Sequence, residues 1–453
     1  RVGSLTAALG WVPTHELRLF GFYNRDDANT KFNDARFPRL EFSLPTEEYS
    51  FGGSYFLAPT SMIQARAGRN KVDGWQDYTQ LVGAIPVLGR FDDEEISRDL
   101  QLGFRMRHED RWELAAGAER SKSPESSLLT LRLTGAPPVY SDGARIGERT
   151  GLGYISVKRL FSPTAYVQAD LVWTDYTKRL DGELLQGGVQ TIIGRDFNVR
   201  KATPRIGFTF EPLKDHRLRF AYQDWIRPSS PGGLAPVATA GIVLDETLLR
   251  FGGRLKRSAV KWETEWSPRL YTELFYDQRR AENLDTYDVT LAENFANLAR
   301  IRQKSLTEVT DFYAGPANVE SSNLFLNSRA RVNQLRGAVN AIANENLSLS
   351  AAYAYTSSRI TLTTDQYYLP RDTVKLGATW ISASRWRLSF EAQWRSEAWT
   401  FLDLAAPRPA YWNAAASVYW ETPDKRYGVN LFAKELLTPH ESAFYGVAAS
   451  VKF

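Results

Sequence analysis

Hydrophobic and polar residues alternate along many short stretches of this chain. Between Trp386 and Arg395, three aromatic residues occupy one phase of the alternation and three charged residues occupy the other. Successive side chains of a strand point to opposite faces, so this stretch predicts a strand with one apolar and one charged face. A soluble core would leave the charged face buried without partners, whereas a membrane barrel meets lipid outside and water inside. The pattern therefore favours a transmembrane barrel.

The same alternation recurs as nine hairpins followed by a final strand at 445–453. Each hairpin turns at Pro, Asn, Asp or Ser, residues that suit tight turns. The predicted fold class is all-β: one large antiparallel transmembrane β-barrel of about 20 strands, 19 of them visible, over residues 1–453. The paired segments are 4–11 with 16–23, 49–57 with 62–69, 100–108 with 112–118, 151–160 with 165–176, 205–211 with 217–225, 258–266 with 271–278, 334–343 with 347–355, 373–381 with 386–395, and 412–421 with 427–435.

Short turns alternate with long connections along the chain. Outer-membrane barrels keep short turns on the periplasmic side and long loops outside, and bacterial single-chain barrels have an even number of strands. Nineteen visible strands are an odd number, so we expect either a further strand before Arg1 or one more strand within the chain that the pattern does not reveal. We favour a longer protein of which this is the C-terminal part. The predicted long connections are 26–48, 74–98, 119–149, 179–201, 227–256 and 280–332.

The longest connection, 280–332, contains a capping box at Thr290–Glu293 and apolar residues at helical spacing after it. It is either a surface loop with one short helix or a loop folded over the pore mouth as a constriction. A barrel this wide with an empty interior would leak, so we expect an occluding element, either this loop or a domain outside the chain. The candidate gating residues are Leu291, Phe295, Leu298 and Ile301.

Composition narrows the possible functions. The chain has 453 residues, no Cys, 13% aromatic residues and a net charge of +4. The lack of Cys excludes disulfides, thiolate zinc sites and Cys nucleophiles, and the small, evenly spread charge argues against nucleic-acid binding. There is no apolar run of about 18 residues, so no transmembrane helix is predicted. The four histidines (His15, His108, His216 and His440) fall at turns or strand ends without metal-ligand spacing, so we expect no metal and no cofactor.

Enzyme motifs are missing from the sequence. There is no nucleophile elbow, phosphate-binding glycine loop or zinc signature. Glu263 and Glu265 would face the same side of one strand about 7 Å apart, a spacing that a glycosidase pair could use. With Lys261 and arginines nearby, an ion-paired lumen wall is favoured instead, and we expect no enzyme. The acidic run Asp92–Glu95 is predicted to lie in a solvated loop, with binding of a cation or of lipopolysaccharide-associated calcium as the less favoured alternative.

The lumen is the candidate site. Inward-facing charges set which solutes enter a pore through their electric field. Cations outnumber anions among the residues that face inward by phase, which favours anionic or polyhydroxylated solutes, unless these residues simply form a charge-paired wall. The predicted pore-lining residues are Arg105, Arg107, Asp170, Arg219, Lys261, Glu263, Arg387, Glu391 and Arg395.

The segment Arg217–Pro236, in which a strand ends at Arg227-Pro228 and Leu234 follows, resembles the mid-barrel segment of TonB-dependent receptors. Tyr368–Pro370, Asn430–Phe432 and terminal Phe453 are also similar to that family. Two features depart from it: no plug domain or partner-contact segment is seen, and Ala-Lys-Glu-Leu follows Phe432 where Asp and Tyr are usual. Barrels of similar architecture also occur behind helical-repeat periplasmic domains in polysaccharide exporters.

We therefore expect an outer-membrane transport channel that moves solute or polymer, either passively or gated by a partner. The first alternative is the barrel of a TonB-dependent nutrient-uptake receptor, and the second is a non-transporting barrel that serves as an adhesin, phage receptor or assembly scaffold. The expected location is the bacterial outer membrane. The expected partners are outer-membrane lipid and lipopolysaccharide, a periplasmic or plug partner, and the barrel-assembly machinery through Phe453.

Overall fold

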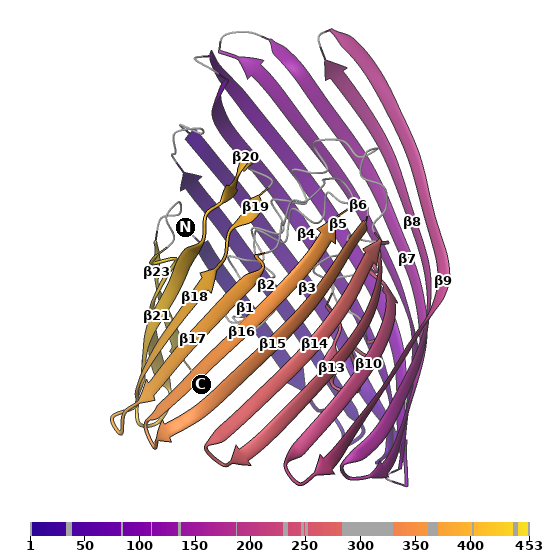
Figure 1. Cartoon of the computed structure of the whole chain (residues 1–453). Helices are drawn as coiled ribbons and strands as arrows, with labels where there is room; N and C mark the ends of the chain where they lie inside the picture. Colours follow the sequence, from indigo (N-terminus) through magenta and orange to yellow (C-terminus); the bar gives the residue numbers. More distant parts are fainter. Residues whose placement is uncertain are drawn as a thin grey trace.

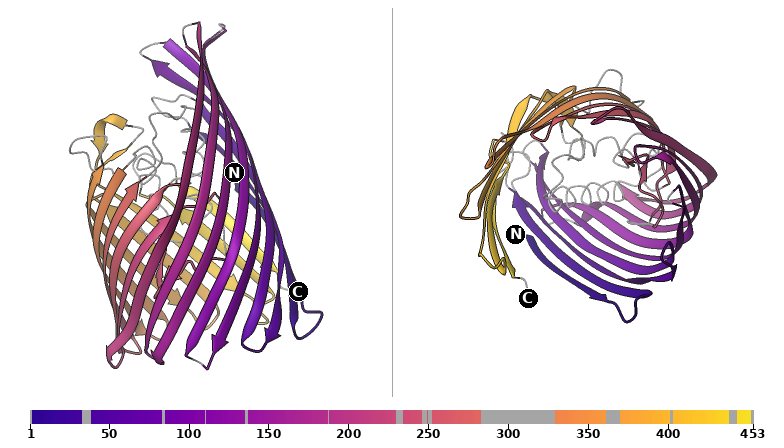
Figure 2. Two further views of the ribbon diagram at one scale, coloured as in Figure 1. Left: turned by 90° about the vertical axis from the view of Figure 1, so that its right-hand side faces the viewer. Right: turned by 90° about the horizontal axis from the view of Figure 1, so that it is seen from below.

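The computed structural model shows a sheet that curves into a ring (Figure 1, Figure 2). Among the described residues, no helix is both long and apolar enough to cross a membrane. The described residues are 2–32, 39–82, 85–109, 111–134, 137–186, 188–229, 234–245, 249, 252–282, 329–360, 370–400, 403–437 and 443–451.

Nineteen strands form this one antiparallel sheet, and each pairs with its neighbours along the chain. They correspond one to one to the nine predicted hairpins and the final strand, so the predicted fold class is confirmed. β1 and β23 are the two edges of the sheet. The strands are β1 Val2–Trp11, β2 Leu17–Phe32, β3 Arg39–Ala58, β4 Ser61–Val82, β5 Ile85–His108, β6 Trp112–Leu133, β7 Pro138–Ser162, β8 Ala165–Gln186, β9 Val189–Leu213, β10 His216–Ile226, β13 Arg254–Ser267, β14 Leu270–Glu282, β15 Arg329–Asn344, β16 Leu347–Ile360, β17 Asp372–Ile381, β18 Trp386–Arg395, β21 Tyr411–Glu421, β22 Tyr427–Lys434 and β23 Phe444–Val451.

Strands β3 to β9 are 20 to 25 residues long, far longer than predicted. The prediction of long connections at 26–48, 74–98, 119–149 and 179–201 was therefore wrong, because these segments are mostly strand. The acidic run Asp92–Glu95 likewise lies in β5 and not in a loop. A strand needs only about ten residues to cross the hydrocarbon layer, so the sheet continues into water, where apolar alternation no longer marks it.

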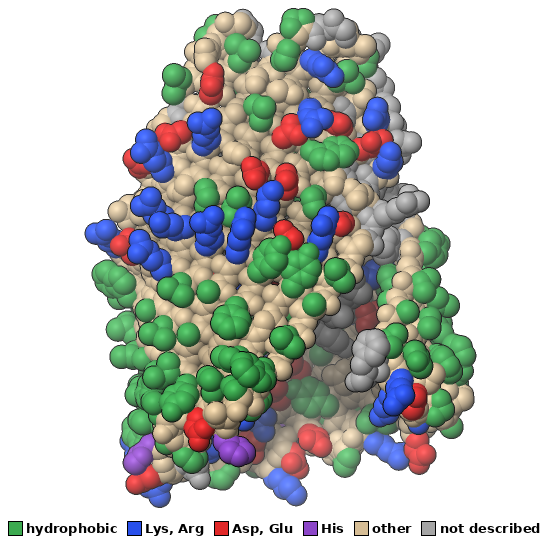
Figure 3. Space-filling view, turned by 180° about the vertical axis from the view of Figure 1, so that it is seen from behind, with side chains coloured by type: hydrophobic (Ala, Val, Ile, Leu, Met, Phe, Trp, Pro, Cys, Tyr) green, Lys and Arg blue, Asp and Glu red, His purple; other side chains and the backbone are tan. Residues whose placement is uncertain are grey.

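The outer face of the sheet carries an apolar belt, which Figure 3 shows below a more highly charged region. Trp262 pairs in register with Leu218 and Leu274, and its side chain is 45% exposed. Large apolar side chains exposed in such a continuous belt are typical of a surface that meets lipid. Trp11, Trp112 and Trp266 lie at the short-turn ends of their strands, where a membrane interface favours aromatic rings.

A hairpin inside the lumen and the wall that holds it

Between β10 and β13 the chain turns into the ring (Figure 2). Residues 234–245 contain two short paired strands, β11 (Ala238–Thr239) and β12 (Ile242–Val243). The two residues between them, Ala240 and Gly241, have φ of 51° and 78°, as a two-residue hairpin turn requires. Glycine is favoured at 241 because residues with a side chain rarely adopt this φ, and a Cβ there would also displace the guanidinium of Arg219. We call residues 234–245 the lumen hairpin.

Side chains of the barrel wall satisfy the backbone of the lumen hairpin. Backbone carbonyls placed away from water need such partners, because an unmet polar group is costly. The donors come from four consecutive strands, β8, β9, β10 and β13. The hydrogen bonds to hairpin carbonyls are Gln168 Nε2 to Ala238 O (3.1 Å), Arg205 Nη1 to Pro236 O (2.8 Å), Thr209 Oγ1 to Ala240 O (3.1 Å), Arg219 Nη1 to Ala240 O (3.2 Å), Gln223 Nε2 to Ile242 O (2.9 Å) and Arg257 Nη1 to Val243 O (2.6 Å).

Buried ion pairs hold these donors in place. The Arg257 guanidinium donates two bonds to the carboxylate of Asp277, at 2.8 and 2.9 Å, and both side chains are almost fully buried. Arg279 donates to Asp277 at 2.6 Å and to Asp245 at the end of the lumen hairpin. Asp277 thus fixes two arginines that both reach the hairpin. Forked, charge-assisted bonds of this kind are geometrically specific, so they set where the hairpin docks.

The same hairpin also fills the lumen with apolar side chains. Leu234 and Leu244 pack against a buried cluster that comes mostly from the inward faces of the wall and also includes Ala235 and Leu249. Its core includes Tyr154 and Trp225, and the Arg205 guanidinium lies 5.2 Å from the Trp225 ring centre. The lumen hairpin is therefore held by apolar burial as well as by hydrogen bonds.

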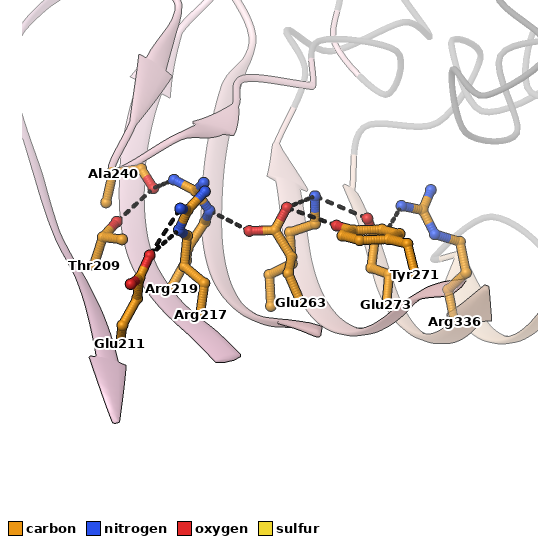
Figure 4. Close-up of polar contacts among 10 residues, drawn as sticks. Thr209, Glu211, Arg217, Arg219, Ala240, Glu263, Tyr271, Glu273 and Arg336 are labelled. Atoms are coloured by element: carbon orange, nitrogen blue, oxygen red, sulfur yellow. Dashed lines mark hydrogen bonds and ion pairs between the residues drawn. The ribbon is translucent and has the colours of Figure 1, made fainter. Parts of the chain in front are cut away.

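A chain of alternating charges runs along the wall next to the hairpin turn (Figure 4). Arg219 Nε lies 2.5 Å from Glu263, and Lys261 Nζ bridges Glu263 at 3.0 Å and Glu273 at 2.8 Å. Glu273 in turn pairs with Arg336 of β15. These groups meet because β10, β13, β14 and β15 are neighbours in register: Arg219 pairs with Lys261, and Glu263 pairs with Glu273.

The predicted pore-lining residues all fall on the inward face, but they do not form one site. Arg219, Lys261 and Glu263 belong to the charge chain, while Asp170 pairs with Arg205 at 3.3 Å beside the lumen hairpin. Three more lie on β18 and two on β5. These last residues are Arg387, Glu391, Arg395, Arg105 and Arg107.

Several predicted positions lie outside the described residues. They are Leu291, Phe295, Leu298, Ile301, His440 and Phe453. In the part of the chain that the structure describes, no group of three potential ligands could hold a metal ion. His15, His108 and His216 lie at or beside short turns. His216 Nδ1 lies 3.2 Å from Thr264 Oγ1, and its ring meets Trp266 edge-on.

Sequence periodicity did not predict the lumen hairpin. Its strands have two residues each, too short to show any period, and 227–256 was expected to be an external connection. The sequence held one usable signal on the wall: Gln223 lies between the inward-facing Ala221 and Trp225, and Arg257 lies between the inward-facing Leu255 and Ala259. Such buried donors need acceptors inside the ring.

No protein-family model matches the chain, and no curated protein matches its sequence. Solved structures do match it. The ferric yersiniabactin uptake receptor FyuA from Yersinia pestis aligns with a TM-score of 0.69 at 10% identity, over 99% of this chain and 68% of the receptor. The ferripyoverdine receptor of the outer membrane of Pseudomonas aeruginosa aligns with a TM-score of 0.65 at 12% identity, over 99% and 64%. The ferric-catecholate import receptor Fiu from E. coli K12 gives 0.65 at 10%, over 100% and 74%.

The chain has the barrel fold of TonB-dependent outer-membrane receptors. The predicted resemblance and the predicted location in the bacterial outer membrane are thus confirmed. These neighbours are transport receptors and not enzymes. This outer-membrane barrel spans about two-thirds of their length, from 64% to 74% in the three receptors above.

Proposed function

We propose that this chain is the barrel of a TonB-dependent nutrient-uptake receptor, which moves a solute inward with energy from a periplasmic partner. The supporting observation is the fold shared over 99% of the chain with receptors for ferric yersiniabactin and ferripyoverdine. A metal chelate is therefore the first class of solute to test. A passive or otherwise gated channel, the main expectation from sequence, is the competing function.

The lumen hairpin supports energised uptake over passive flow. It lies within the ring and is held by donors from four strands and by a buried apolar cluster. A permanently open pore would leave such donors free for water and solute. Releasing the hairpin means breaking these buried bonds together, which requires an input of free energy.

We assign two roles to the predicted lumen residues. Asp170, Arg219, Lys261 and Glu263 keep the wall in the geometry that receives the lumen hairpin. The other five, on β5 and β18, contact the solute or a plug partner during passage. This division predicts that substitutions in the first group alter gating, whereas those in the second alter solute affinity.

Uptake by the complete gene product tests the proposal. Radioactive iron bound to a panel of chelators is supplied to a strain that lacks its own chelate receptors, with and without its energy-coupling protein. We expect uptake of at least one chelate, and only when the coupling protein is present. Uptake without the coupling protein would indicate a passive channel, and neither uptake nor conductance would indicate a non-transporting barrel.

A further inference from the structure

Two rows of basic side chains cross the outer face of the barrel. In each row, four cations on four consecutive strands stand directly opposite one another in the sheet register. Each row lies on the long-strand side of the apolar belt, which is the outer side under the rule that short turns are periplasmic. Row one is Arg69, Arg98, Lys122 and Arg149, on β4 to β7, and row two is Lys256, Arg280, Arg331 and Arg359, on β13 to β16.

Few counter-charges lie beside these cations among the described residues: Arg69 lies near Glu47, and Lys256 stands opposite Asp224, which is itself bonded to Arg254. Over the described ranges, none of the eight forms an ion pair or a side-chain hydrogen bond, and all but the half-buried Lys256 are exposed. Other outward cations do have partners: Arg200 lies 3.1 Å from Asp175, and Lys71 lies 3.1 Å from Asp73. Like charges directly opposite in a sheet destabilise it. An anion from outside the chain would relieve the repulsion that remains within both rows.

The position of the rows relative to the membrane indicates the source of that anion. The outward neighbours of Arg69 and Arg98 on the belt side are Ala67 and Leu100, and Tyr49 stands beside Arg69 in the same row. On the belt side of row two lies one row of polar residues that includes Ser258 and Gln278, and beyond it lie Val260 and Tyr276 of the apolar belt. Figure 3 shows Lys and Arg gathered just above the apolar belt. Long basic side chains here reach the headgroup level of the outer leaflet while acyl chains cover the belt.

We propose that each row binds the phosphate groups of lipopolysaccharide, the glycolipid of the outer leaflet. Four cations at the strand spacing of about 4.8 Å form a line about 14 Å long, enough for more than one phosphate. Guanidinium groups grip phosphate with two parallel bonds, and six of the eight cations are arginine. The proposal concerns the outer face alone and does not rest on the proposed uptake function.

Binding of purified lipopolysaccharide to the full chain in an uncharged detergent tests this. Arg98→Gln with Lys122→Gln halves the charge of row one. The matched control is Arg25→Gln with Arg90→Gln, which removes two outward cations that each pair with an aspartate on their own strand. We expect about thirtyfold weaker binding for the row variant and less than threefold for the control, with the difference shrinking as salt is raised. Equal loss in both variants would overturn the proposal.

Two further measurements distinguish the phosphates of lipopolysaccharide from other anions. Lipopolysaccharide stripped of its phosphates should bind the wild type and the row variant equally, and a preserved difference would overturn the proposal. Inorganic phosphate at the same concentration should not raise the melting temperature, and an equal rise would show a free-anion site instead. Without lipid, the row variant should melt no lower than the wild type, because repulsion is relieved. A lower melting temperature would show that the row serves the barrel itself.

Discussion

The lumen hairpin offers a quantitative prediction, because one arginine couples it to the wall. Arg257→Met removes the hydrogen bond from the guanidinium to Val243 O at 2.6 Å, while Arg279 still pairs with Asp277 at 2.6 Å. Loss of the Asp277 contacts weakens the wall whether the hairpin is docked or released, so it largely cancels from the docking equilibrium. A hydrogen bond from a charged group contributes about 2 kcal/mol, so release should become about thirtyfold more frequent.

Thiol labelling measures this release directly, because the chain contains no Cys. Thr239 is fully buried in the hairpin, so Thr239→Cys reacts with a maleimide only when the hairpin leaves the wall. Under conditions where the hairpin opens and closes faster than the thiol at position 239 reacts, we expect Arg257→Met to raise the labelling rate about thirtyfold. Arg217→Met is the control, because Arg217 pairs with Glu211 and makes no hydrogen bond to the hairpin. An unchanged rate in Arg257→Met would refute the docking account.

Three further substitutions test other contacts. Gly241→Ala, at φ 78°, should destabilise the docked hairpin by about 1 kcal/mol and so speed the labelling of Thr239→Cys about fivefold. A labelling rate equal to that of Thr239→Cys alone would show that the turn tolerates a side chain. Glu263→Gln removes the carboxylate that pairs with Arg219 and leaves Lys261 with Glu273 alone, so it should lower the unfolding free energy in urea by about 3 kcal/mol. The matched change Glu211→Gln, at the more exposed pair with Arg217, should lower it by less than about 1 kcal/mol. Leu431→Arg on the lipid face should lower the unfolding free energy by about 2 to 4 kcal/mol, whereas Asn430→Arg on the lumen face should lower it by much less. Equal losses of unfolding free energy in the two variants would contradict the assignment of faces.

The sequence predicts the barrel because lipid imposes a strict period of two. Trp386–Arg395 shows this, since each residue keeps its predicted face in β18. Above the membrane that constraint ends. Asp92 and Asp93 face opposite sides of β5, yet both are acidic, so neither face is marked and the strand was taken for a loop.

The site is less predictable than the fold for a similar reason. The phase of alternation places Arg219, Lys261 and Glu263 inward, and their spacing along the chain suggests pairing. Docking of the lumen hairpin depends on contacts between separate segments of the chain, such as Arg257 with Val243, 14 residues apart, and Gln168 with Ala238, 70 residues apart. No local sequence pattern indicates which backbone carbonyl an inward-facing side chain will bind. The two rows of cations also emerge only from the cross-strand register.

Cysteine scanning of β18 in lipid bilayers tests the central claim most directly. Single Cys residues from Leu388 to Gln393 are spin-labelled, and their exposure to oxygen, which partitions into lipid, is compared with exposure to a water-soluble nickel complex. Oxygen accessibility should peak at 388, 390 and 392, and nickel accessibility at 389, 391 and 393, because successive side chains face lipid and lumen in turn. Accessibility that does not alternate with a period of two would contradict the membrane-spanning barrel.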